Sequence, residues 1–404
     1  MPPQRRPRSK PITRRAADIT KLPARAAPQI AVAVQPNSPI LPAKGMRMVL
    51  TSLLFCATIL LVAATLLPVW QSPLWWVRAL EFPRLQILGL QALALIGTLW
   101  HGNFVLALAL VGVMLMQARH IWPFNPLARK EMHRAASGGA AHDVSCLAMN
   151  VLMENTNHAA VLAEIARVDP DVLFLMETDA TWDAALAPGL ARYPTVLREI
   201  KDNYYGLIFA TRLPCHAARV TYLSVEDTPS VLAELAAPDG TRFRFVGLHP
   251  KPPVPGEDTE GRDAEVAYAA RHARDSDLPV ISMGDFNTPA WSQIAHRFKS
   301  VGGYLDPRIG RGPLSSFDAS RWWLRMPIDQ FYATNDVSLI DFRRGPHVGS
   351  DHFPMHARVR FDDPVGARSR NRAVTALPDA EEARILAAIE RQGRRLRSQR
   401  PPSP

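Results

Sequence analysis

Cysteine is scarce in this sequence, with three residues among 404. Cys56 lies within a long apolar run, which leaves Cys146 and Cys215 for the rest of the chain. Two cysteines cannot form the network of cross-links that stabilises small secreted domains, so a disulfide framework is excluded. Because both can remain free thiols, the cysteines do not identify the compartment.

The sequence also lacks an internal repeat of the kind that forms solenoids. A cleavable signal peptide is not expected, because the first apolar run starts too late, is too long and lacks a convincing small-residue cleavage site. With 404 residues and 47% apolar content, the chain can bury one sizeable domain plus appendages.

Acidic residues are depleted at both ends of the chain. Residues 1–47 carry ten Lys or Arg against one acid, and residues 364–404 carry nine against four. These segments contribute +9 and +5 to a net charge of +10, which leaves −4 for the middle. The middle therefore lacks the basic excess of a DNA groove, whereas basic tails beside a membrane gain about 1 kcal/mol per residue near anionic lipid.

Charged residues are absent from residues 48–70, a run long enough to cross a bilayer, which needs about 20 apolar residues. Two shorter uncharged runs follow at 85–100 and 104–117, and we interpret them as a tight transmembrane hairpin; buried helices of a soluble protein are the alternative. Tryptophans near the run ends fit an aromatic belt: Trp70, Trp75, Trp76, Trp100 and Trp122. We expect about three transmembrane helices in residues 48–117, after a disordered basic tail at 1–47.

The basic tail also predicts the orientation. Positively charged segments stay in the cytoplasm, so three crossings place everything after Gln117 outside it, and two crossings leave it inside. We expect a multi-pass protein of the cell (inner) membrane, with the lipid bilayer as a partner. The domain after a linker at 118–142 is then extracytoplasmic.

The most informative motif is Gly284-Asp285-Phe286-Asn287, which is followed later by Ser350-Asp351-His352. A buried strand at 278–283 ends in an acid and an amide, and a second strand end supplies an acid beside an imidazole. An Asp can hold or deprotonate a water, an Asn can donate to a phosphate oxygen, and a His can meet charge that develops on phosphorus. Together the motifs predict phosphate-ester chemistry.

Other polar residues also follow apolar runs. Asn150 closes a short apolar strand, and Glu177 ends the apolar run 172–176. A hairpin marked by Pro238-Asp239-Gly240 leads to His249. Functional groups of open α/β layers gather at strand ends, so these residues are candidates for the same site.

In this order the motifs resemble the endonuclease/exonuclease/phosphatase superfamily, which has the fold of deoxyribonuclease I. The resemblance covers residues 143–361. The motif positions that carry it are, in sequence order, Asn150, Glu177, Thr211 to Pro214, His249, Gly284 to Asn287, Ile328-Asp329 and Ser350 to His352. It implies an α+β catalytic domain built as a four-layer α/β/β/α sandwich.

The resemblance also implies a divalent-metal site. Glu177 would hold Mg²⁺ or Mn²⁺, and Asn150 would help to position the metal or the nucleophile. Asp285 would orient or deprotonate the attacking water, and Asn287 would donate to the phosphoryl oxygens.

The remaining candidates surround that centre in the same resemblance. His352, held by Asp351, would stabilise the transition state or act as a base. His249 would contact the phosphate or protonate the leaving oxygen. Asp329 would lie one layer further out, and Tyr205 is a candidate to face the phosphate.

We therefore expect a membrane-anchored, metal-dependent phosphoesterase that hydrolyses a phosphodiester or phosphomonoester with an activated water. Its substrate is either nucleic acid, cleaved by endonuclease or exonuclease action, or a lipid phosphate such as a polyprenyl pyrophosphate. The alternative outside the enzymes is a catalytically inactive membrane scaffold. Such a protein would be expected to have lost some of the metal-binding and catalytic residues, but all of them are present here. Residues 362–404 are expected to form a basic tail with a helix at 379–399.

Overall fold

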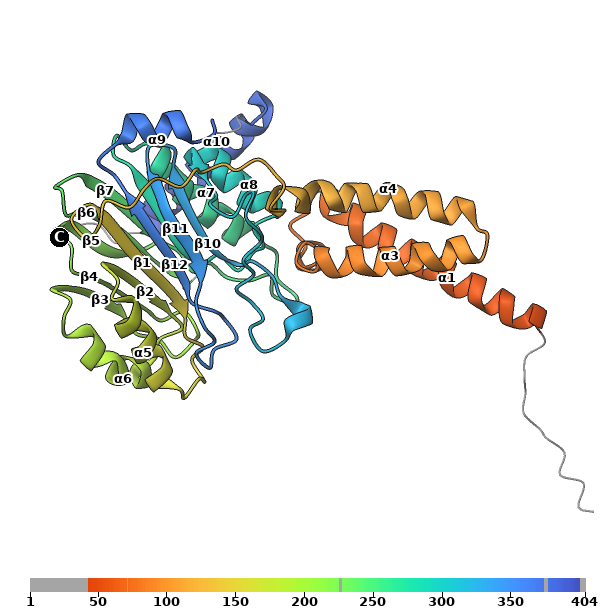
Figure 1. Cartoon of the computed structure of the whole chain (residues 1–404), viewed down its shortest axis with the longest axis horizontal. Coiled ribbons are helices and arrows are strands. Elements are labelled where there is room, and N and C mark those ends of the chain that lie inside the picture. Colours follow the sequence, from red (N-terminus) through yellow and green to blue (C-terminus); the bar gives the residue numbers. More distant parts are fainter. Residues whose placement is uncertain (1–42, 71, 225–226, 374–376, 400–404) are drawn as a thin grey trace, which may run out of the picture. The chain divides into compact units, whose positions relative to one another are not determined.

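The computed structural model describes residues 43–70, 72–224, 227–373 and 377–399. Two six-stranded sheets lie face to face in its main domain (Figure 1). The first sheet has the order β11-β12-β1-β2-β4-β3, and the second has the order β5-β6-β7-β8-β10-β9.

The strands of the first sheet are β1 (Asp143–Asn150), β2 (Val172–Met176), β3 (Thr195–Glu199), β4 (Leu207–Thr211), β11 (Ser338–Arg344) and β12 (Met355–Arg360). The strands of the second sheet are β5 (Cys215–Tyr222), β6 (Pro229–Ala236), β7 (Arg242–Gly247), β8 (Val280–Asp285), β9 (Tyr304–Leu305) and β10 (Asp329–Thr334). The expected hairpin before His249 is the β6–β7 pair, which is antiparallel.

The fully apolar sequence of β2 is explained by burial on both of its faces. Phe174 points between the sheets, where its ring lies 5.9 Å from that of Phe245 in the second sheet. Leu173 and Leu175 point the other way and pack in one cluster with Trp182 of a covering helix. Side chains alternate along a strand, so a strand covered on both faces needs an unbroken apolar run.

Helices cover both outer faces of the paired sheets. The first sheet is covered by α5 (His158–Val168) and α6 (Ala180–Leu190), and the second by α7 (Glu260–Arg274), α8 (Gln293–Gly302) and α10 (Asp379–Gln399). A short helix, α9 (Pro364–Arg370), precedes α10. This arrangement confirms the expected α/β/β/α sandwich.

The N-terminal helices are α1 (Ala43–Leu66), η1 (Leu67–Trp70), α2 (Trp75–Ala79), α3 (Arg84–Trp100), α4 (Phe104–Ile121) and η2 (Trp122–Phe124). Among the described residues, two helical segments are long and apolar enough to cross a membrane, Gly45–Trp70 and Phe104–Phe124. Two helices, and not the expected three, therefore meet this test, because the third apolar helix is too short for it. The middle helix, α3, has only 17 residues, whereas α4 continues past Gln117 to Ile121.

Hydrogen bonds between these helices define their directions. Near the end of α1, Thr65 Oγ1 accepts from Gln91 Nε2 of α3 at 2.8 Å and from Gln117 Nε2 of α4 at 3.3 Å. Near the start of α1, Thr51 is hydrogen-bonded to His101, in the turn that joins α3 to α4. Hence α1 and α4 run in the same direction, and α3 runs opposite to both.

The connector at 72–83 binds the helices to the catalytic domain. Arg78 Nη2 lies 2.9 Å from Asp263 Oδ2 of α7 in a largely buried ion pair. Trp291, just before α8, donates its indole N–H to the Glu81 carbonyl oxygen at 2.8 Å. The sandwich domain is thus fixed at the end of α1 and α4 where both helices finish.

Gly284, at the end of β8, permits a close approach between neighbouring strands. Its φ is +147°, and a Cβ there would overlap the carbonyl oxygen of Leu248 and lie 3.1 Å from Phe174 Cε1. We predict that Gly284→Ala lowers the free energy of unfolding by about 2 kcal/mol or more and displaces Asp285. Chemical denaturation of the detergent-solubilised full chain measures this loss.

Gly89→Ala is the matched control for this substitution, because nothing lies within 4 Å of a methyl group added at Gly89 in α3. It should leave the unfolding transition of the catalytic domain in place. Equal midpoints for Gly284→Ala and Gly89→Ala would contradict the predicted clash.

Candidate active site

The candidate site lies where β1, β2 and β8 end at their carboxyl termini. In the parallel β1–β2 pair, Asn150 is opposite Met176, which places Glu177 beside Asn150. Asn150 Nδ2 donates to Glu177 Oε1 at 2.6 Å and to Asp285 Oδ2 of the second sheet at 3.2 Å. One amide therefore joins two carboxylates that come from different sheets.

Two residues here have a backbone conformation that is costly for a residue with a side chain. Glu177 has φ +61° and Asn287 has φ +47°. Left-handed backbone at residues other than glycine costs about 1–3 kcal/mol and is concentrated at functional sites. In Asn287 the strain is held by two bonds, from its N–H to Asp285 Oδ1 at 2.8 Å and from its Nδ2 to the Pro250 carbonyl at 3.0 Å.

Asp285 lies between two imidazole rings. His352 Nε2 is 3.6 Å from Asp285 Oδ2, and His249 Nε2 is 3.8 Å from the same oxygen. The other nitrogen of His352, Nδ1, is 2.7 Å from Asp329 Oδ2. Asp329 reaches this position because it pairs with Asp285 across the antiparallel β8–β10 ladder.

The expectation that Asp351 holds His352 is therefore corrected, since Asp329 does so. The Asp351 carboxylate is instead 3.5 Å from Ser350 Oγ, and its backbone carbonyl accepts from Ala319 N at 2.7 Å. Ser350 Oγ also accepts from His352 N at 3.0 Å and donates to the Asn150 carbonyl at 2.8 Å. These bonds direct the ring of His352 towards Asp329 and Asp285.

Tyr205 is also brought to the site, although indirectly. Its ring centroid lies 5.3 Å from that of His249. Its neighbour Tyr204 is hydrogen-bonded to Glu154 and is more exposed. Among the two tyrosines, Tyr205 is the one that contacts a candidate catalytic side chain.

A segment without a sequence motif completes the surroundings of His352. The ring of Phe317 lies 4.9 Å from the imidazole, and Ser316 Oγ accepts from Asp329 N at 3.0 Å. Sequence reasoning missed both residues, because they lie in a long loop before β10. The only sequence pattern that could have pointed to Ser316 and Phe317 is the small polar pair Ser315-Ser316 beside an aromatic residue.

Burial and neighbouring charges give the groups of the site different protonation states. Burial raises the pKa of Glu177 to about 7 and also raises that of Asp285, although His352 opposes both shifts. Burial lowers the pKa of His249 to about 4. For His352 burial acts in the same direction, but the carboxylates of Asp329 and Asp285 outweigh it and raise the pKa to about 10. At neutral pH a neutral imidazole and an imidazolium thus flank Asp285.

Asp285, Asp329 and His352 place potential metal-ligand atoms within 4.8 Å of one another. His352 is already paired with Asp329, and its positive charge would repel a cation. Glu177 fits a metal better, because its buried carboxylate makes no ion pair with Lys or Arg in the described parts of the chain. Carboxylate and amide oxygens from Glu177 and Asn150 are the hard donors that Mg²⁺ and Mn²⁺ prefer.

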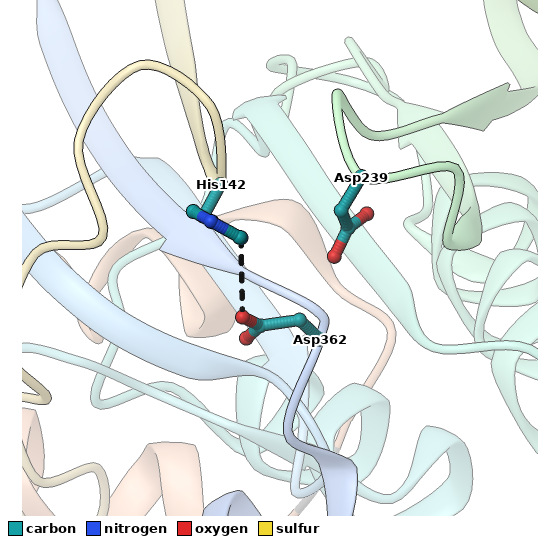
Figure 2. A group of neighbouring side chains, drawn as sticks. All are labelled: His142, Asp239 and Asp362. Carbon is teal, nitrogen blue, oxygen red and sulfur yellow. Dashed lines mark ion pairs between the residues drawn. The ribbon is translucent and has the colours of Figure 1, made fainter.

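A second group of possible metal ligands lies at the other end of β1 from Asn150. Figure 2 shows His142, Asp239 and Asp362, of which His142 Nδ1 is 3.4 Å from Asp362 Oδ2. His142 precedes β1, so the length of that strand separates this group from Asn150 by roughly 23 Å. Asp239 and Asp362 are exposed, and the group takes no part in the site described above.

Comparisons with known proteins identify the family of this chain. The model of the endonuclease/exonuclease/phosphatase family matches residues 147–352, just over half of the chain. This chain belongs to the endonuclease/exonuclease/phosphatase family. Membership makes it a phosphoric ester hydrolase of a class that uses a divalent metal, and it confirms the resemblance of its motifs.

The search of curated proteins gives no match. Similar solved structures include humanized D. rerio TDP2, with 15% identity, 54% of this chain and 99% of that chain covered, and a TM-score of 0.47. A Bacteroides vulgatus endonuclease/exonuclease/phosphatase has 16% identity, 55% and 99% coverage, and a TM-score of 0.45. The human nocturnin catalytic domain with bound sulfate has 15% identity, 54% and 94% coverage, and a TM-score of 0.45.

The hydrogen bond between Asp329 and His352 gives a direct test of the corrected assignment. Asp329→Asn keeps the size of the side chain but removes the charge that holds the imidazolium. We expect turnover to fall about 10²-fold, as for loss of an acid–base group, while the folded state persists. Turnover at saturating substrate and Mg²⁺ measures this loss.

Asp351→Asn is the matched control, because the Asp351 carboxylate is next to His352 in the chain but lies against Ser350 Oγ, whereas Asp329 bonds the imidazole. It should cost clearly less turnover than Asp329→Asn. A larger loss for Asp351→Asn would restore the assignment made from the sequence.

Proposed function

We propose that this protein is a membrane-anchored, divalent-metal-dependent phosphoesterase whose catalytic domain lies outside the cytoplasm. The observation that carries the catalytic part is the Asn150 amide, which holds Glu177 and Asp285 together. A complete set of this kind also argues against an inactive scaffold, for which such buried carboxylates would be a cost without a use.

Mg²⁺ or Mn²⁺, when bound, supplies positive charge that polarises a phosphoryl oxygen and the attacking water. Glu177 would hold the ion, and Asn150 would orient both carboxylates beside it. Asp285 would accept a hydrogen bond from the water and take its proton as attack proceeds. Its buried position between two imidazoles keeps bulk water from competing for that contact.

The other residues would act on the phosphate itself. The Asn287 side-chain amide has two N–H groups and uses one for Pro250, so the second can donate to a phosphoryl oxygen. His352 would direct its Nε2–H and its positive charge at the negative charge that develops on the phosphoryl oxygens. His249 is neutral and would contact the phosphate by a hydrogen bond, with Tyr205 packed against its ring.

The directions of the long helices support an extracytoplasmic catalytic domain. As membrane spans, α1 and α4 both lead from the Thr51–His101 end to the Thr65–Gln117 end. The chain from 72 to 103, which includes α3, returns between them. With α1 and α4 as membrane spans, the Thr51 end of α1 and the catalytic domain would therefore lie on opposite sides, whichever way the helices are inserted. The basic residues of 1–47 favour the cytoplasm for the N-terminal side.

The anchor and the charge distribution favour a lipid phosphate over nucleic acid as the substrate. A nuclease of duplex DNA needs a positively charged track along the phosphates. The sequence between the two basic tails carries a net charge of −4 instead. An anchored enzyme also meets lipid substrates at high local concentration, because both are confined to one surface.

Glu177→Gln tests the metal assignment. The substitution keeps the size of the side chain and removes the anionic oxygen, so we expect at least about 10²-fold loss of activity without loss of folding. Plasmid DNA, a polyprenyl pyrophosphate and an inositol phosphate are assayed side by side, each with Mg²⁺ and with chelator. Glu390→Gln, on the exposed face of α10, is the control and should stay at the wild-type rate.

Activity that survives both chelator and Glu177→Gln would contradict the metal proposal. The rates on the three substrates identify the substrate class independently of the metal test. Cleavage of the plasmid alone would favour the nuclease.

Reporter fusions test the topology. Alkaline phosphatase, which folds outside the cytoplasm, should be active when fused after Phe361. The same reporter inserted after Gly102, in the turn between α3 and α4, should be inactive, because that turn lies at the other end of α1 and α4. The opposite pair of results would place the catalytic domain in the cytoplasm.

A further inference from the structure

Exposed tryptophans gather at the end of the helices that carries the catalytic domain. Trp70 and Trp122 stand at the ends of the two long apolar segments and are 74% and 56% exposed. Trp76, in the connector between α1 and α3, is 42% exposed. Tryptophan favours the interface between the hydrocarbon and the head groups, where one edge of the ring is apolar and the N–H is wet.

The catalytic domain adds two more tryptophans to this group. Trp322 and Trp323 form the start of a single helical turn, η3 (Trp322–Leu324), and are 79% and 57% exposed. The backbone carbonyl of Trp323 accepts a hydrogen bond from Gln86 Nε2 at 2.9 Å. Gln86 is the third residue of α3, so it lies within about 5 Å of the start of that helix along its axis. The Trp322–Trp323 turn therefore lies beside the helices, at the level where they leave the catalytic domain.

The same turn is continuous with the wall of the active site. The ring of Phe317, five residues before Trp322, packs on His352. Ala319 N donates to the Asp351 carbonyl at 2.7 Å, next to His352 in the chain. A short segment thus leads from the catalytic imidazole to the exposed tryptophans.

Arginines flank the pair, in the sequence Arg321-Trp322-Trp323-Leu324-Arg325. Arg321 is held at 2.9 Å from Asp318, with its side chain 59% exposed. Arg325 lies over the ring of Phe353 at 5.1 Å from its centroid. Cations beside interfacial aromatic residues are attracted to lipid phosphates at a membrane surface.

We propose that residues 321–325 form a membrane-contact loop that seats the active site on the bilayer surface, so that the substrate is a phosphate ester in the head group of a membrane lipid. This inference rests on the proposed phosphoesterase function and names its substrate class. Arginine and tryptophan can also stack on single-stranded nucleic acid. The contact with α3 and the three tryptophans at the helix ends favour lipid, because they place the loop at a membrane surface.

The test compares hydrolysis of the same group, an isoprenyl pyrophosphate, when it is held in a membrane and when it is dissolved in water. The full chain is reconstituted in phosphatidylcholine vesicles and given either a long-chain polyprenyl pyrophosphate in the same vesicles or a water-soluble short-chain isoprenyl pyrophosphate. In the double variant Trp322→Ala/Trp323→Ala, the ratio of kcat/KM for the vesicle substrate to that for the soluble substrate should fall about tenfold or more. The loss should appear mainly as a higher apparent KM for the vesicle substrate.

Trp100→Ala is the matched control, because Trp100 is 91% exposed at the opposite end of the helices. Its ratio should stay at the wild-type value. An unchanged ratio in the double variant overturns the inference. So does a wild-type enzyme that cleaves single-stranded oligonucleotides but not the lipid, with cleavage lost in the double variant.

A second measurement does not depend on activity. Trp323 is replaced by the photo-crosslinking residue p-benzoylphenylalanine in the full chain, and Val365, which is 75% exposed in α9, is replaced as the control. Illumination in phosphatidylcholine vesicles should give a lipid adduct at 323 and none at 365. Absence of the adduct at 323 overturns the inference even when the enzyme is active. An adduct in a protein that hydrolyses no phosphate ester would support the membrane contact and count against the proposed function.

Discussion

The two hydrogen bonds of the Asn150 amide are the contact on which the site depends. They hold Glu177 from the first sheet and Asp285 from the second within reach of one group. Two buried carboxylates repel each other, so they stay together only where the fold leaves them no alternative. That constraint comes from the aromatic contacts between the sheets, such as Phe174 against Phe245, which fix the separation of the strand ends. Packing between the two sheets thus sets the geometry of the site.

Much of this arrangement could be predicted from the sequence, because strand ends leave a local signal. An apolar run such as 172–176 followed by an acid identifies both a buried strand and a carboxylate at the edge of its sheet. The partner of His352 could not be predicted in this way. Asp351 is adjacent in the chain, whereas Asp329 is adjacent only through the β8–β10 register. The chain bends at Ser350 and Asp351, and the His352 ring is turned towards Asp329, so the neighbour in sequence was the wrong choice.

The membrane region shows the same limit. Hydropathy reports how long and apolar a segment is, and by that measure α3 falls short. It does not report direction, which here follows from polar contacts inside the helical region. Thr65 Oγ1 accepts from the side-chain amides of both Gln91 and Gln117, and these two bonds hold the three helices in one alignment. The side on which the catalytic domain lies is therefore a property of these contacts more than of a count of apolar segments.

The fixed orientation of the catalytic domain could then contribute to the choice of substrate, in addition to the side chains of the active site. The domain is held by the connector, through Arg78 and Glu81, and separately by the bond from Gln86 to the Trp323 carbonyl. Two attachments at different places restrict rotation in a way that a single flexible linker does not. The phosphate chemistry proposed for Asp285 and His352 would accept many esters, since it would act on a group that all of them share. On the proposed function, a substrate would be selected by the direction from which its phosphate can approach, and a head group fixed in the plane of the bilayer would approach from one direction only.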